Sequence, residues 1–153
     1  MKAAWTATRR HAVKELRWRV EPVKFAPRRE KSFGEADSLA ALRDPKQSKA
    51  KCCNAAFQLA WLKRIKEPVE LTCLEAGPAR VLHLPGEPFI EYQLKAQKLG
   101  KDRFVCVAVY GDGGTGYIPT DRAFFEGGYE PTVALAAPCE RTLTAALAKL
   151  LGA

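Results

Sequence analysis

The sequence predicts an α/β domain with a mixed sheet and flanking helices. Two observations support this fold class. Residues 80–110 read as strand, helix and strand, and further segments with helical apolar spacing lie before and after them. Because β-α-β units are almost always right-handed with parallel strands, the carboxyl ends of these two strands should share one edge of the sheet. Such edges are where α/β sheets bind ligands.

The amino-terminal part of the chain predicts one strand and two helices. Apolar and charged residues alternate over residues 16–21, which is the period of a half-buried strand whose solvent face is charged. Residues 21–44 predict a long connection that ends in a short helical piece near residues 39–42. From about residue 48 to 66 a surface helix is predicted by one apolar stripe, made of Cys53, Phe57, Trp61 and Ile65.

The remainder predicts the β-α-β unit between a hairpin strand and a final helix. Apolar runs at residues 69–74 and 80–84 flank a turn at 75–78, as in a β-hairpin. A helix should begin near Pro88 and end at Gly100. Residues 103–110 form a near-continuous apolar run, typical of a strand covered on both faces. Leucine spacing over residues 140–151 predicts the last helix.

Composition and charge place limits on the class of protein. The 153 residues are 47% hydrophobic and 27% charged, which indicates one soluble domain that needs no disulfide or metal to fold. We expect residues 1–15 to be an irregular basic lead-in and residues 16–153 to be a single α/β domain. No apolar stretch approaches the roughly 20 residues of a membrane span, and no signal peptide is visible. The sequence alone leaves the compartment unknown, with the cytoplasm as the default.

The basic residues are concentrated near the amino terminus. Of the 25 Lys and Arg residues, ten lie within residues 1–35, whereas only four of the 17 acidic residues do, and the net charge is +8. A nucleic-acid-binding module is therefore an alternative hypothesis. No nucleic-acid-binding motif accompanies the charge, so we favour a solvated basic surface.

The five cysteines do not predict a metal site of their own. Cys52, Cys53, Cys73, Cys106 and Cys139 form no C-x-x-C pair and have no histidine at ligand spacing. We expect reduced thiols, with Cys53 and Cys106 as small buried hydrophobes.

Residues 111–116, GDGGTG, satisfy the glycine pattern of a dinucleotide-binding turn after a predicted strand. A Rossmann turn opens directly into a helix, however, and here Pro119 follows the last glycine at three residues. No Gly-Lys-Ser or Gly-Lys-Thr follows either, which excludes a Walker motif. What remains is a flexible loop that lets the backbone approach a ligand or metal closely.

Glu87 is the candidate acidic residue at the predicted edge. It stands between Gly86 and Pro88, and the proline holds it in an extended conformation at the end of a strand. Either it is an exposed residue favoured by the next helix dipole, or it acts on a ligand together with Tyr117 from the neighbouring strand end. His83 points away from Leu82 and Leu84, as expected of a structural imidazole, and His11 carries no signal.

Two strings resemble a known family. LHLPGEPFIEYQLKAQKL and AVYGDGGTGYIPT, followed by FFEGGYEP, are similar to the carboxyl-terminal part of the catalytic domain of the neutral ceramidases, zinc-dependent amidohydrolases that cleave N-acylsphingosine. The resemblance covers residues 16–152 in outline. It is specific at Pro-Gly-Glu after one strand and at Gly-Tyr-Ile-x-Thr after the next.

This resemblance implies roles for three residues. Glu87 and Tyr117 take the places of two zinc ligands, and Tyr129 takes that of a tyrosine that helps to hold the developing oxyanion. It also implies zinc as the cofactor, a lipid-like N-acyl substrate and a secreted or membrane-associated setting. In that family two histidine ligands lie far upstream, and this chain has no corresponding stretch.

We therefore expect a ceramidase-like hydrolase fragment that carries half of a metal shell and is inactive alone. The missing amino-terminal half of the catalytic domain would be its partner. Two alternatives from other classes remain: the nucleic-acid-binding module, and a non-catalytic partner-binding α/β domain that associates through its uncovered apolar surface.

Overall fold

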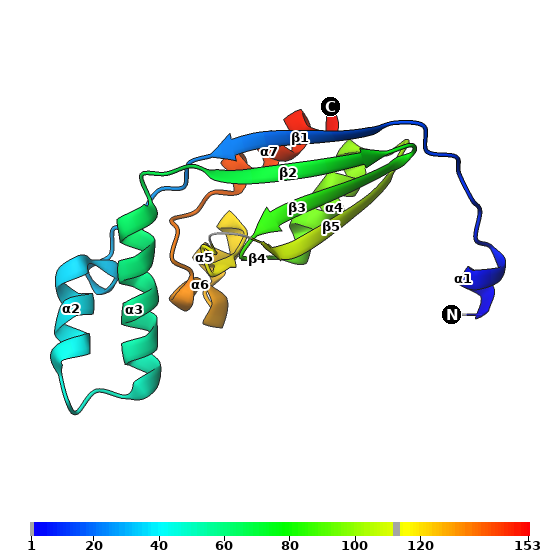
Figure 1. Ribbon diagram of the computed structural model, residues 1–153. Helices are drawn as coiled ribbons and strands as arrows, with labels where there is room; N and C mark the ends of the chain where they lie inside the picture. The colour runs from blue at the N-terminus through cyan, green and yellow to red at the C-terminus, as the bar shows by residue number, and fades with distance from the viewer. Residues whose placement is uncertain (1, 112–113) are drawn as a thin grey trace.

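The computed structural model describes residues 2–111 and 114–153, and they form an α/β fold (Figure 1). Its helices are α1 (Lys2–Thr6), η1 (Lys31–Phe33), α2 (Glu35–Arg43), α3 (Lys49–Arg64), α4 (Ile90–Leu99), α5 (Asp121–Glu126), α6 (Tyr129–Val133) and α7 (Glu140–Leu151). Its strands are β1 (Leu16–Val23), β2 (Val69–Ala76), β3 (Ala79–Pro85), β4 (Glu87–Pro88), β5 (Phe104–Gly111) and β6 (Tyr117–Ile118).

Four strands form a mixed sheet in the order β1-β2-β3-β5. β1, β2 and β3 are antiparallel neighbours, whereas β3 and β5 are parallel and are joined by α4, which confirms the predicted β-α-β unit. The hairpin turn is tighter than expected, because β2 continues to Ala76 and β3 already begins at Ala79. Gly77 turns the chain with a positive φ of 54°.

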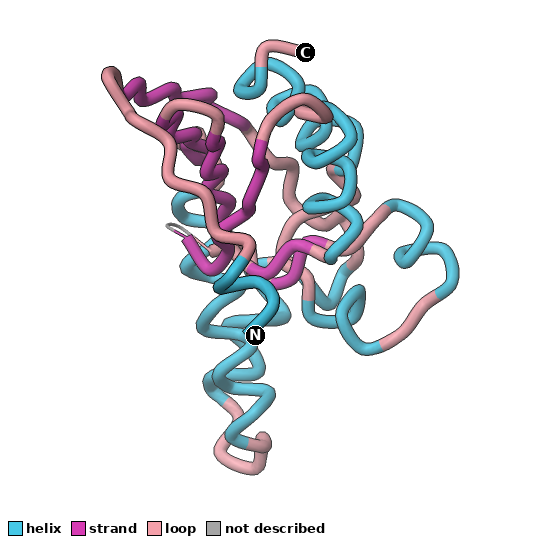
Figure 2. Tube along the Cα trace, turned by 90° about the vertical axis from the view of Figure 1, so that its right-hand side faces the viewer, coloured by secondary structure: helices cyan, strands magenta, loops and turns pink. Residues whose placement is uncertain are grey.

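One face of the sheet is covered by α4 and α7, and the main core lies between this face and the two helices. In Figures 1 and 2 both helices lie on the same side of the strands. The leucine stripe predicted for α7 is fully buried there, and α4 contributes Tyr92 and Ala96. The Tyr92 hydroxyl donates to the Pro119 carbonyl at 3.0 Å, so α4 is tied to the segment that follows β6.

The predicted burial of β1 is wrong. The alternating apolar side chains Leu16, Trp18 and Val20 are exposed and only Val23 at the end of the strand is buried, whereas the charged residues Arg19 and Glu21 face α7. Arg19 Nε lies 2.5 Å from a carboxylate oxygen of Glu75, and Glu21 accepts from Lys149 at 2.6 Å. The apolar and charged alternation over residues 16–21 predicted that the apolar side chains would face the core. The charged side chains lie there instead, because charges that are paired can line a face covered by a helix.

The other burial predictions are also wrong, and for β5 the reason is that, within the part of the chain that the structure describes, one face of the sheet carries no helix. β5 alternates between exposed and covered positions instead of being covered on both faces. Cys106 is only partly buried, and Cys53 is exposed. All five cysteines are free thiols.

Helices α2 and α3 form a hairpin at the end of the sheet where α5 and α6 also lie (Figure 1). The predicted short helix near residues 39–42 is longer, because α2 starts at Glu35. Ser48 caps α3 by accepting from the Lys51 N–H. The α3 stripe is only half packed, since Trp61 is buried and Phe57 is exposed.

The segment before β1 lies beyond the opposite end of the sheet, and α1 stands away from the other elements (Figure 1). Its residues are exposed throughout residues 2–15. None of the helices that the structure describes is both long and apolar enough to cross a membrane.

Candidate functional site

The position of Glu87 depends on a glycine at the end of β3. Gly86 has a φ of 59°, and a Cβ atom placed there would lie 2.4 Å from the Gly116 carbonyl oxygen. Only glycine fits such a close backbone approach in this conformation. Gly86 therefore turns the chain out of β3 and directs Glu87 toward the segment that follows β5.

Glu87 and Tyr117 lie side by side. They are register partners in the parallel pair β4–β6, which is held by hydrogen bonds from Glu87 N to Gly116 O at 2.9 Å and from Phe89 N to Ile118 O at 3.1 Å. The structure thus brings together the carboxylate and the phenol that the sequence placed at one edge. Their roles as metal ligands remain predictions.

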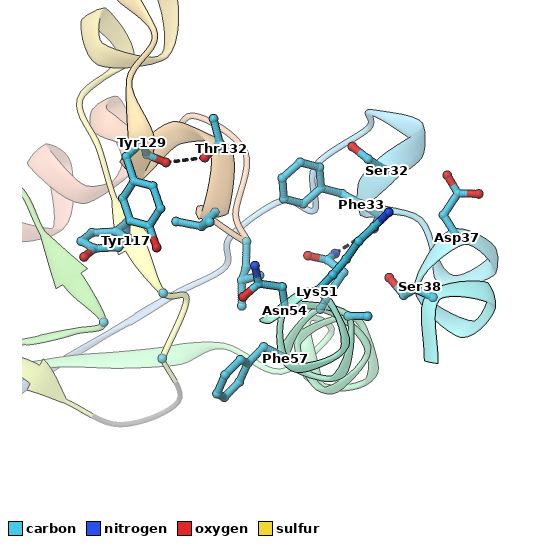
Figure 3. Close-up of a pocket in the computed structure, with 18 of the residues that line it drawn as sticks. Ser32, Phe33, Asp37, Ser38, Lys51, Asn54, Phe57, Tyr117, Tyr129 and Thr132 are labelled. Carbon is cyan, nitrogen blue, oxygen red and sulfur yellow. Dashed lines mark hydrogen bonds between the residues drawn. The ribbon is translucent and has the colours of Figure 1, made fainter. Parts of the chain in front are cut away.

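Tyr129 joins this pair from the first turn of α6. Its ring packs edge-on against Tyr117, with the centroids 6.0 Å apart and the planes at 79°. The Tyr129 carbonyl accepts from the Thr132 hydroxyl, and the Tyr129 ring appears beside Tyr117 in Figure 3. The phenol of Tyr129 is exposed, so it is free to contact a ligand that reaches Tyr117.

Tyr110 is a further phenol in the site that sequence reasoning missed. Its N–H donates to Gly86 O at 2.8 Å, and its phenol lies close enough to the Glu87 carboxylate for that charge to raise its pKa. The apolar run at residues 103–110 predicts only that Tyr110 ends a strand. Nothing in the sequence indicates that its backbone leaves the strand conformation at this position.

The charge of Glu87 controls the ionisation of its neighbours. It is the largest cause of the raised pKa of Tyr117, followed by burial and by Tyr129. A hydrogen bond with Glu87 and then its charge raise the pKa of Tyr110. Both phenols therefore hold their protons at neutral pH, and a cation bound beside Glu87 would oppose this effect.

A cavity of about 830 Å³ opens beside these residues and continues along the α2–α3 hairpin (Figure 3). Phe33, Phe57, Val133 and Leu135 give it apolar walls, and Lys51, Asn54 and Gln58 of α3 add polar groups. Gln58 is buried and donates to Phe33 O at 2.8 Å, while its own carbonyl oxygen finds no donor among the described residues. No sequence pattern indicates that α3 lines this cavity.

The glycine-rich loop approaches the same cavity. Gly111, Gly114 and Gly116 are part of the lining. Asp112 and Gly113 lie outside the described residues, so the flexibility expected of this loop stays a prediction.

The residues at hand fit part of a zinc shell, but not a complete one. Glu87 and Tyr117 present adjacent oxygen atoms, which are suitable donors to a cation. A catalytic zinc normally has three protein ligands, and no cluster of three His, Cys, Asp or Glu residues occurs within residues 2–111 and 114–153. His83 lies on the sheet against Gly111, and His11 is exposed before β1.

Comparisons with known proteins relate the fold to ceramidases. No protein-family model matches the sequence, and no curated protein matches it. Among solved structures, the neutral ceramidase from Pseudomonas aeruginosa superposes with a TM-score of 0.55 at 17% identity, over 90% of this chain and 27% of that chain. A ceramidase complexed with C2 gives a TM-score of 0.45 at 17% identity, over 56% of this chain and 14% of that chain.

The first of these matches shows a ceramidase-like fold over most of the chain. The chain spans about a quarter of the length of that ceramidase. At this identity the likeness concerns the fold, and the activity has to be argued from the site.

Proposed function

We propose that this chain forms part of the active site of a ceramidase-like, zinc-dependent amidohydrolase whose substrate is an N-acyl amide such as N-acylsphingosine. The observation that carries the proposal is the register pairing of Glu87 with Tyr117 at the rim of a cavity. The ceramidase-like fold supports the same reaction class.

Each residue of the site has a defined task in this proposal. Glu87 and Tyr117 hold the metal, and Tyr129 donates its hydroxyl proton in a hydrogen bond to the developing oxyanion. When bound, zinc lowers the pKa of a coordinated water toward about 7 and polarises the acyl carbonyl. The apolar walls from Phe33, Phe57 and Leu135 accept the lipid chain of the substrate.

The same proposal requires donors from outside this chain. Two oxygen ligands bind zinc weakly, so the remaining ligands come from another polypeptide segment, which corresponds to the missing amino-terminal half of the catalytic domain. The isolated chain should therefore hydrolyse no N-acylsphingosine in the presence of zinc.

Zinc titration of the isolated chain by calorimetry tests the assignment directly. We expect weak binding of one zinc ion that is lost in Glu87→Gln and reduced in Tyr117→Phe, and that is unchanged in Tyr129→Phe because Tyr129 contacts the substrate and not the metal. Zinc binding that survives both Glu87→Gln and Tyr117→Phe would contradict the ligand assignment. Zinc-dependent turnover by the isolated chain that Glu87→Ala abolishes would contradict the proposed incompleteness.

A further inference from the structure

Among the described residues, no helix packs on the face of the sheet opposite α4 and α7 (Figures 1 and 2). The strand register aligns twelve side chains on this open face in three rungs that cross all four strands. The rungs are Leu16, Ala76, Ala79 and Phe104; Trp18, Leu74, Val81 and Cys106; and Val20, Thr72, His83 and Ala108. None of the twelve is Asp, Glu, Lys or Arg.

The open face exposes an unusual amount of large apolar surface. Leu16 is 65% exposed, Trp18 61%, Phe104 68% and Val20 43%. An aromatic side chain presents roughly 150–250 Å², so Trp18 and Phe104 alone leave roughly 200–320 Å² in water. With Leu16 and Val20 added, the face reaches the few hundred Å² at which an exposed apolar patch marks an interaction site.

The charge distribution favours this face for self-association. The chain carries a net charge of +8, so most approaches of two copies bring positive surfaces together. Arg19 and Glu21 of β1 point to the opposite, helix-covered face, where they pair with Glu75 and Lys149. Two copies that meet through their open faces bring no charged side chain of the rungs into the interface.

The shape of the open face can also complement that of a second copy. On the second and third rungs, β1 at one edge of the sheet carries the bulky Trp18 and Val20, and β5 at the other edge carries the small Cys106 and Ala108. A two-fold axis parallel to the strands stacks β1 of one copy over β5 of the other. Trp18 then covers Cys106 of the partner subunit, and Val20 covers Ala108 of the partner subunit.

We propose that a second copy of this chain covers the open face, so that two sheets stack as an aligned β-sandwich about this axis. The assembly is independent of the proposed catalytic function, because none of its contacts involves Glu87 or Tyr117. It also explains why Leu16, Trp18 and Val20 of β1 face away from the core.

Sedimentation velocity over a range of concentrations tests the assembly. The wild-type chain should be a dimer, and Trp18→Glu should weaken dimerisation at least about 100-fold, because it buries an unpaired charge in the interface. The matched control is Phe125→Glu on α5, where the aromatic residue is 93% exposed and lies outside the open face. This variant should remain a dimer, and circular dichroism should show both variants folded.

Cross-linking tests the orientation. In a Cys53→Ser background, Trp18→Cys should be joined by a short bismaleimide to Cys106 of the partner subunit, as identified by peptide mass spectrometry. Phe125→Cys in the same background should give no such link. A wild-type chain that is monomeric at all concentrations overturns the proposal and leaves the face for a different polypeptide. A dimer that Trp18→Glu leaves intact, or links that join other positions, overturns it as well.

Discussion

Tyr110 lies beside Glu87, because its backbone N–H donates to the carbonyl of the preceding Gly86 at 2.8 Å, and its own backbone has a φ of +63°. Among the described residues no other non-glycine residue has a positive φ. A bulky side chain in the left-handed region is strained, and such strain concentrates at functional sites. The strained residue lies beside the paired Glu87 and Tyr117, which supports the proposed function of these residues.

Replacing Glu87 by Gln should lower the pKa of both Tyr110 and Tyr117. The negative charge of Glu87 opposes formation of the phenolates, so its removal lets both pKa values fall toward the ordinary value of about 10. Spectrophotometric titration of the tyrosines measures this change.

The matched control is Glu70→Gln, an exposed carboxylate on β2 that does not contact the phenols. It should leave the tyrosine titration unchanged. A titration curve of Glu87→Gln that coincides with that of the wild type would show that Glu87 is not the group that holds these phenols neutral.

Replacing Gly86 by Ala should disrupt the pairing of β4 with β6. The new Cβ would meet the Gly116 carbonyl oxygen at 2.4 Å, and a left-handed alanine alone costs about 1–2 kcal/mol. We expect a loss of at least about 2 kcal/mol in the free energy of unfolding measured in urea. Gly114→Ala is the control, because its nearest non-neighbouring atom is 3.9 Å away, and it should change stability by less than about 0.5 kcal/mol. Equal effects of the two changes would argue against the close approach at Gly86.

The contrast between Glu87 and Trp18 shows what the sequence could predict. Glu87 and Tyr117 follow two strands joined by a helix, and the handedness of that connection fixes where both strands end. The alternation around Trp18 correctly predicts a strand, but it cannot tell which face receives the helices. That choice is visible only in the register with β2, which is far away in sequence and pairs Arg19 with the core residue Cys73 and Trp18 with Leu74. The strained backbone of Tyr110 likewise depends on its hydrogen bond to Gly86 and leaves no local pattern.

The cysteines should differ sharply in reactivity. Burial raises the pKa of Cys139 to about 12 and also raises that of Cys73, so neither forms the reactive thiolate at neutral pH. Cys53 is exposed on α3. Timed alkylation with iodoacetamide, followed by peptide mass spectrometry, should modify Cys53 first, and Cys73 and Cys139 only after unfolding in urea. Modification of Cys139 as fast as Cys53 in the folded chain would contradict the packing of α7.

Tyr92 should make the protein less stable at high pH. Burial raises its pKa far above the ordinary value of about 10, so the folded chain keeps the phenol proton while the unfolded chain loses it. This contribution is fully present below about pH 10 and is lost as the pH rises, by up to about 1.4 kcal/mol per pH unit. Tyr92→Phe should cost about 0.5–1.5 kcal/mol at neutral pH, because the hydrogen bond to Pro119 is lost, yet its stability should decline less above pH 10. Urea unfolding from pH 7 to 11 measures both effects. Tyr129→Phe, an exposed position, should follow the wild-type curve throughout, and the same alkaline decline in Tyr92→Phe as in the wild type would assign the loss to other groups.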